Sequence, residues 1–135
     1  MAELSCAGIA KSFGERPVLT DGDLAVPEGT LTAILGASGS GKTTLLRIIM
    51  GFIPADRGVV RVGGEVVVED GRTPVPAHRR AIGYVAQEGA LFPHLTVSGN
   101  VAFGLPRSER RVAGRVAEAL GLVGLDPSYS GRHPQ

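Results

Sequence analysis

The sequence predicts an α/β fold built around a phosphate-binding loop, and three features of the chain support this class. Residues 36–43 spell Gly-x-x-x-x-Gly-Lys-Thr. A short apolar run precedes this motif and an apolar helical segment follows it, which is the strand–loop–helix context that a phosphate loop requires. Two β-branched runs joined by a Gly-Gly pair predict an antiparallel hairpin. At 135 residues the chain is long enough for one domain with a buried core.

Apolar and alternating segments place the elements in the first part of the chain. A polar turn over residues 11–17 separates the first two runs, and Pro-Glu-Gly at residues 27–29 ends the second. Pro54 and the polar residues after it end the helix that follows the loop. The predicted elements are strands at residues 3–10, 18–26 and 31–35, and a buried helix from residues 44–50.

Phosphate binding explains each residue type in the loop. Glycines let successive backbone N–H groups curl around phosphate oxygens, and the start of the helix adds partial positive charge. Lys42 can reach the β- and γ-phosphates, and the Thr43 hydroxyl can bind Mg²⁺. We therefore expect a nucleoside triphosphate and Mg²⁺ as ligands. The residues expected at the nucleotide are Gly36, Ala37, Ser38, Gly39, Ser40, Gly41, Lys42, Thr43 and Thr44.

A hairpin is predicted after the helix. Residues 59–62 and 65–68 are β-branched runs, and the glycines between them supply the positive φ of a tight turn. Asp70 comes after the second run and admits two interpretations. It could be the acid that completes a magnesium site, but Gly71 favours a turn residue, because the run before Asp70 is already one arm of a hairpin.

The rest of the chain is predicted to contain one further strand and one helix. The strand covers residues 81–86 and ends at Gln87, and residues 88–100 read as a loop. Thr96 offers part of an N-cap signal for the segment after it. Residues 108–125 carry an apolar face at helical spacing, and residues 126–135 read as a loop.

Composition limits the function classes. A net charge of +1 predicts no surface for nucleic acid. The single cysteine, Cys6, excludes an intrachain disulfide and is expected to be buried in a strand, which suits a reducing compartment. Met1 is followed by neither a basic leader nor an apolar signal segment, and no apolar run reaches the ~20 residues of a membrane helix. We therefore expect a cytoplasmic protein.

With these motifs in hand, the chain resembles the N-terminal part of the ATPase subunit of ATP-binding-cassette (ABC) transporters, nearly from end to end. The loop, the hairpin and the run Tyr-Val-Ala-Gln-Glu-Gly-Ala-Leu-Phe-Pro-His-Leu-Thr-Val at residues 84–97 carry the resemblance. It implies that Phe13 stacks on the adenine, where tyrosine is more common. It also implies that Gln87 is the catalytic-site glutamine that contacts Mg²⁺ and the attacking water. Residues 92–97 and 100–105 resemble the segment beside the transmembrane coupling helix, so His94 is expected to be an interface residue.

The resemblance also implies partners and a location. Subunits of this family work on transmembrane permease subunits of an importer, with a second ATPase subunit in a homodimer, at the cytoplasmic face of the plasma membrane. The run over residues 76–94 is most similar to ferric-iron import ATPases. Importers of polyamine, sulfate, sugar or thiamine are the alternative within the family. Outside it, the alternatives are a small phosphate-loop kinase, or a module that docks without catalysis.

The sequence departs from the family pattern after Gln135, where the Leu-Ser-Gly-Gly-Gln signature, the Asp-Glu strand and the switch histidine would come next. The expectation is therefore an N-terminal portion of an ABC nucleotide-binding domain over residues 1–135, truncated before the signature. Because the catalytic glutamate and the partner signature are missing from the sequence, this chain is expected not to hydrolyse ATP at a useful rate. We also expect exposed apolar strand edges and a tendency to aggregate.

Overall fold

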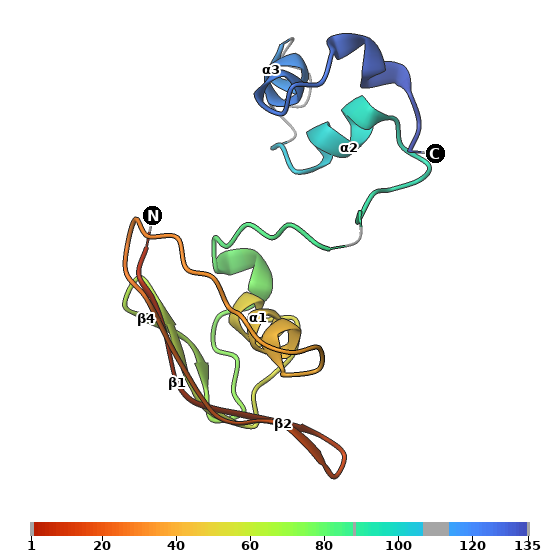
Figure 1. Cartoon of the computed structure of the whole chain (residues 1–135). Helices are drawn as coiled ribbons and strands as arrows, with labels where there is room; N and C mark the ends of the chain where they lie inside the picture. The colour runs from red at the N-terminus through yellow and green to blue at the C-terminus, as the bar shows by residue number, and fades with distance from the viewer. Residues whose placement is uncertain (1, 88, 107–113, 135) are drawn as a thin grey trace. The chain divides into compact units, whose positions relative to one another are not determined.

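The computed structural model describes residues 2–87, 89–106 and 114–134, which form two compact units, Met1–Tyr84 and Val85–Gln135. The first unit contains a sheet and one α-helix (Figure 1). Its elements are β1 (Leu4–Phe13), β2 (Arg16–Val26), α1 (Lys42–Met50), β3 (Arg57–Val62), β4 (Glu65–Glu69) and the short 3₁₀ helix η1 (Ala77–Arg79). This mixture of helix and sheet agrees with the predicted α/β class and its antiparallel β-subdomain.

The sheet is antiparallel throughout, in the order β2-β1-β3-β4. The hairpin between β3 and β4 turns at Gly63 and Gly64, whose φ angles are 58° and 82°. A residue with a Cβ atom adopts such angles only at a cost, so this glycine pair sets the turn, and the hairpin prediction is confirmed. The first two strands also form where the sequence predicts strands, but β1 extends to Phe13 and β2 starts at Arg16.

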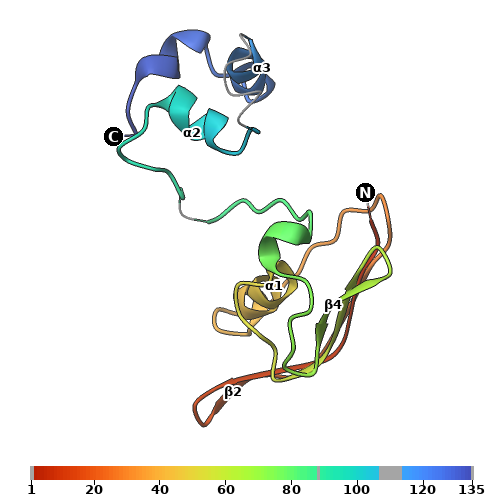
Figure 2. The ribbon, with the colours of Figure 1, turned by 180° about the vertical axis from the view of Figure 1, so that it is seen from behind.

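Helix α1 supplies one side of the core, and Figures 1 and 2 show it lying against one face of the sheet. Its buried side chains are Leu45, Ile48, Ile49 and Met50, which recur at helical spacing. Ile48 packs with Ile9 of β1 and Val60 of β3, and none of these three side chains is exposed. Each such side chain contributes about 1.5–3 kcal/mol by burial, so the helix is held by its apolar face more than by intrinsic propensity.

Cys6 lies in this core, as predicted. It is a free, buried thiol in β1. Burial, with a smaller effect of the Asp23 charge, raises the pKa of Cys6 to about 11. The thiol is therefore protonated and unreactive at neutral pH.

A buried arginine ties the end of α1 to the rest of the first unit. Arg80 is 4% exposed, and its guanidinium donates hydrogen bonds to the backbone carbonyls of Ile48 and Ile49 at the end of α1. It also donates to the carbonyl of Val67 in β4 and to that of Val75. The next residue, Ala81, has a φ of 53°, a left-handed conformation that costs a non-glycine residue about 1–3 kcal/mol.

The second unit is helical. It contains α2 (Val97–Phe103), α3 (Arg115–Leu122) and the 3₁₀ helix η2 (Pro127–Gly131). The predicted cap is confirmed, since Thr96 Oγ1 accepts from Gly99 N at 3.2 Å. Asn100 stabilises the turn before α2 through hydrogen bonds of its side-chain amide. Its Oδ1 accepts from Phe92 N, and its Nδ2 donates to the carbonyls of Phe92, Leu95 and Thr96. Among the described residues, no helix is both long and apolar enough to cross a membrane.

Two predicted strands do not form. Residues 31–35 and 81–86 join no ladder with any strand in the described part of the chain. Ile34 and Ile82 pack partly against the core, but other apolar side chains there are uncovered: Leu31 is 100% exposed, Leu35 89% and Val85 95%. The physical reason is that a strand exists only where a neighbour about 4.8 Å away accepts and donates its backbone hydrogen bonds. An apolar run indicates that a segment suits such pairing, but the described segments do not provide the neighbour.

Three other expectations need correction. The predicted loop over residues 88–100 is helical from Val97, because Thr96 and Asn100 satisfy the first turn of α2. Of the helix predicted over 108–125, the structure describes α3 only from Arg115 to Leu122, and residues 107–113 lie outside the described residues. The final predicted loop contains η2, which Asp126 starts by accepting from Ser128 N.

Candidate functional site

The phosphate loop ends in a tight contact with β2. Gly41 is the N-cap of α1 and has a φ of 89°. A Cβ atom on Gly41 would lie 2.7 Å from Leu19 Cδ2 and 3.0 Å from Val18 O. Glycine is therefore required at this position for two reasons: the backbone is left-handed, and the strand lies too close for a Cβ atom. The motif glycine brings the head of the helix against β2.

The head of α1 carries backbone donors that are free to bind an anion. The first intrahelical bond runs from Leu45 N to Gly41 O at 2.8 Å. Among the described residues, no group accepts from the N–H groups of Lys42, Thr43 or Thr44, and Gly41 has no side chain to cap them. The first turn also contains no acid. Unpaired N–H groups and the helix dipole together make this end of α1 suited to a phosphate.

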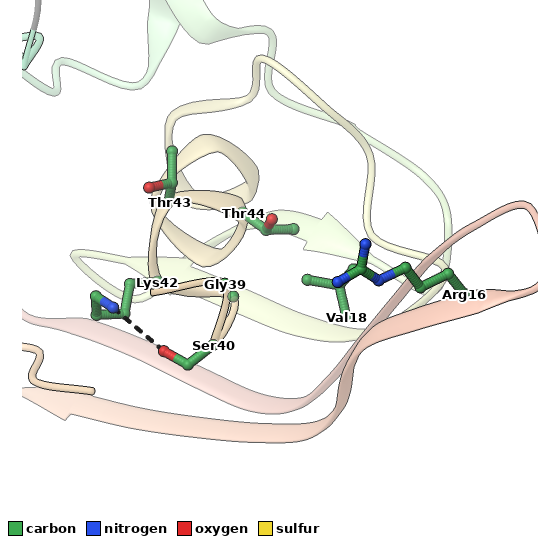
Figure 3. A pocket seen from close by; sticks show the side chains of 8 residues that line it. Arg16, Val18, Gly39, Ser40, Lys42, Thr43 and Thr44 are labelled. Carbon is green, nitrogen blue, oxygen red and sulfur yellow. Dashed lines mark hydrogen bonds between the residues drawn. The ribbon is translucent and has the colours of Figure 1, made fainter. Parts of the chain in front are cut away.

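Lys42 bends back over the loop (Figure 3). Its Nζ donates to Gly36 O at 2.8 Å, to Ala37 O at 2.7 Å and to Ser40 Oγ at 3.3 Å. All three acceptors are neutral, and no acid of the described residues forms an ion pair with Lys42. The positive charge at the loop is therefore uncompensated, and an incoming phosphate oxygen can replace these neutral acceptors with a stronger, charge-assisted bond.

A cavity of about 260 Å³ lies between the loop and β2. Figure 3 shows its lining, with Thr43 and Thr44 on the first turn of α1 and Arg16 and Val18 on the strand. Its eight lining residues are Arg16, Val18, Gly39, Ser40, Gly41, Lys42, Thr43 and Thr44. Six of them belong to the predicted set. Gly36 and Ala37 contribute their carbonyls to Lys42 instead, and Ser38 lies exposed in the turn of the loop.

The chemistry of the lining fits Mg²⁺ bound together with phosphates. The described residues contain no cluster of three or more His, Cys, Asp or Glu side chains that could hold a metal by itself. Thr43 lies in the first turn of α1 and lines the cavity, so its hydroxyl can act as one oxygen ligand. Mg²⁺ usually keeps several waters and takes only one or two protein ligands beside phosphate oxygens, so a single hydroxyl is compatible with it.

Two predicted site residues lie outside this cavity. Phe13 is the last residue of β1, not part of a turn as expected, because its backbone pairs with Arg16. Its ring is 53% exposed and Lys11 Nζ lies 5.6 Å from its centroid. Gln87 is an exposed residue of the second unit. The roles of Phe13 at the adenine and Gln87 at Mg²⁺ and water stay predictions.

Asp70 is a turn residue, as the sequence favours. Its Oδ1 accepts from Gly58 N at 2.9 Å and its own N–H donates to Gly58 O at 3.0 Å. Its φ of 40° is one that aspartate tolerates better than most residues. Both contacts tie the end of β4 to β3, and Asp70 does not line the cavity.

Sequence reasoning did not find Arg16 and Val18, which complete the cavity from β2. The sequence predicts a turn over residues 11–17 and a strand only from residue 18, so Arg16 was not expected in a strand. Nothing in the sequence indicated that these residues would meet the loop. The close approach of β2 to Gly41 places these two residues at the cavity.

Comparisons with known proteins agree with this geometry. A family model described as ABC transporter matches residues 19–134. The "Fe(3+) ions import ATP-binding protein FbpC 1" of Rhodococcus jostii is 54% identical over 97% of the chain. The "Fe(3+) ions import ATP-binding protein FbpC" of Pseudomonas fluorescens is 49% identical over 99%. The chain spans 37% and 38% of the length of these two relatives.

A solved structure has a similar fold. One similar structure is a dimeric, post-hydrolysis state of an ATP-binding cassette bound to ADP and Pi. It superposes with a TM-score of 0.77 at 26% sequence identity, and the match covers 97% of this chain and 61% of that one.

Proposed function

The chain belongs to the ABC transporter family, and we propose that it forms the ATP-binding part of an importer ATPase subunit. The observation that carries the proposal is the uncompensated loop, where Lys42 and the free N–H groups of α1 face a cavity large enough for several phosphate groups. The loop binds the triphosphate, and the Thr43 hydroxyl supplies the protein ligand of Mg²⁺. When bound, Mg²⁺ neutralises phosphate charge.

Ferric iron is the proposed cargo of the transporter. Its support is the relatives named for Fe(3+) import, which are about half identical over nearly the whole chain. Polyamine, sulfate, sugar and thiamine importers remain the alternatives. None of the cavity residues has a chemistry that selects a transported ion, so the support comes from the relatives and not from the loop.

The proposed partners are transmembrane permease subunits and a second ATPase subunit, which places the protein at the cytoplasmic face of the plasma membrane. The second unit offers a surface of suitable character. Leu91 is 57% exposed and Phe103 51%, and the Phe92 ring lies 4.3 Å from that of Phe103. Exposed aromatic side chains of this kind are enriched at protein interfaces. Gln87, which is proposed to contact Mg²⁺ and the attacking water, lies in the same unit as this surface.

Nucleotide binding is tested by titrating the chain with a fluorescent ATP analogue in the presence of Mg²⁺. Lys42→Ala is expected to weaken binding by about tenfold or more, since a charge-assisted bond contributes about 1.5–3 kcal/mol. Arg61→Ala is the matched control, because Arg61 is an exposed cation of β3 outside the cavity. Equal affinity of wild type and Lys42→Ala would contradict the proposed site.

The importer assignment needs a test in cells. Residues 1–134 of this chain replace the matching part of an Fe(3+) importer ATPase in a strain that lacks its own copy. Growth on ferric iron is expected from this chimera and not from the same chimera with Lys42→Ala. A parallel chimera in a polyamine importer serves as the comparison. Support of polyamine uptake without iron uptake would overturn the ferric-iron assignment.

A further inference from the structure

We propose that Arg16 binds the α-phosphate of the nucleotide, so that the phosphate chain lies between two cations, Lys42 at its far end and Arg16 next to the nucleoside. The inference rests on the proposed nucleotide site and names a residue of β2 that the loop motif does not contain. Three observations support it: Arg16 lines the cavity, its guanidinium forms no ion pair with a described acid, and its backbone pairs with that of Phe13.

The position of Arg16 results from the contact between β2 and the loop. Arg16 is the first residue of β2, and Val18, two residues later, lines the same cavity. The backbone of Val18 is in tight contact with Gly41, where an added Cβ would lie 3.0 Å from Val18 O. This contact holds β2 against the head of α1. Arg16, two residues earlier, consequently lines the cavity opposite the first turn of the helix (Figure 3).

Arg16 is free to bind an anion. Its side chain is exposed, and no acid in the described part of the chain forms an ion pair with it. Guanidinium groups bind phosphate through two parallel N–H donors, a geometry that a lysine cannot provide. Arg16 therefore adds to the cavity a positive charge and parallel N–H donors, and no acid among the described residues pairs with them.

The register of the first hairpin indicates which phosphate is bound. Figure 3 shows the Lys42 side chain turned toward Ser40 on one side of the loop, with Arg16 and Val18 on the other. Arg16 is the direct cross-strand partner of Phe13, and directly opposed residues share a face of the sheet. The half-exposed ring of Phe13 is a surface on which a base can stack. A nucleotide whose base is on this side presents its α-phosphate, the one bonded to the nucleoside, to Arg16.

The test compares ligands that lose one group at a time. ATP, ADP, AMP and adenosine are titrated against the chain by ligand-observed NMR. Arg16→Gln is expected to weaken ATP, ADP and AMP by the same factor, roughly tenfold or more, and to leave adenosine unchanged. Lys42→Ala is expected to weaken ATP and ADP but to leave AMP within about twofold. Arg61→Gln, an exposed cation outside the cavity, controls for the change in net charge.

Each other outcome overturns the inference in a distinguishable way. No change in Arg16→Gln, a loss for ATP but not for AMP, or an equal loss for adenosine would each remove Arg16 from the α-phosphate. Wild-type protein that binds ATP no better than Lys42→Ala would instead contradict the nucleotide site itself. Should Arg16→Gln lower the melting temperature, Arg16→Lys decides. That variant keeps the charge but not the pair of parallel donors, so its AMP affinity is expected to lie between those of wild type and Arg16→Gln. An AMP affinity no better than that of Arg16→Gln overturns the proposal.

Discussion

Replacing Arg80 by methionine is expected to destabilise the first unit strongly. Methionine keeps most of the length of the side chain but removes the charge and all the donors. Arg80 is only 4% exposed and donates to four carbonyls, those of Ile48, Ile49, Val67 and Val75. Burial lowers the pKa of Arg80, but an arginine remains charged at neutral pH.

The expected magnitude is worked out from these contacts. Each buried carbonyl that loses its donor costs about 1–3 kcal/mol. The Ile48 carbonyl keeps a second donor, Gly51 N at 3.0 Å, so its loss is partly covered. Removal of the buried guanidinium also relieves its desolvation, which offsets several kcal/mol of the loss. The balance is a loss of about 3–5 kcal/mol, a large share of the roughly 5–15 kcal/mol of an ordinary domain.

Urea unfolding followed by far-UV circular dichroism measures this loss. Arg79→Met is the matched control, since Arg79 is the exposed neighbour, and it is expected to change the free energy of unfolding by less than about 0.5 kcal/mol. Arg80→Lys keeps the charge but loses the planar set of N–H donors, so its free energy of unfolding is expected to lie between those of wild type and Arg80→Met. A loss below about 1 kcal/mol for Arg80→Met would refute the reasoning, because it would mean that the four carbonyls find water or other donors at little cost.

Three further predictions concern the base, the backbone and pH. Phe13→Ala is expected to weaken ATP but not inorganic triphosphate, because stacking contributes about 1–3 kcal/mol per base; equal losses in parallel titrations would mean packing instead. Ala81→Gly is expected to raise the free energy of unfolding by about 1 kcal/mol, since glycine relieves the φ of 53°; a destabilised variant in urea unfolding would contradict this. Hydrogen bonds from Lys11 Nζ and Ser12 N, both at 2.7 Å, lower the pKa of Asp56 below its usual 3.8. This group therefore adds stability above the unfolded pKa, and the contribution is lost as pH falls through the folded pKa. Thermal melts from about pH 6 to about pH 3 should fall more steeply for wild type than for Asp56→Asn, and parallel curves would count against the linkage.

Features that depend on neighbours in the chain could be predicted from the sequence. The loop with its helix, the hairpin turn and the Thr96 cap were predicted correctly. Gly63 and Gly64 permit backbone angles that other residues resist, and Thr96 needs only Gly99, three residues away. Such preferences are set by torsion angles and hydrogen bonds over a few residues, so they hold wherever the segment is placed.

Features that depend on distant segments emerged only from the packing of the chain. Residues 31–35 have an apolar pattern typical of a strand, but a pattern cannot supply the neighbour that a strand must pair with. Arg80 looks like a surface residue until its guanidinium meets Ile48, 32 positions earlier in the chain. Arg16 has no distinguishing feature in the sequence and joins the cavity only because Gly41 lets β2 approach α1. The motif at residues 36–43 was enough to specify the loop, whereas the packing of one strand against it selected the further residues that line the cavity. Burial, strand pairing and cavity lining arise only when distant segments pack together, so the sequence of one segment does not reveal which other segment it will contact.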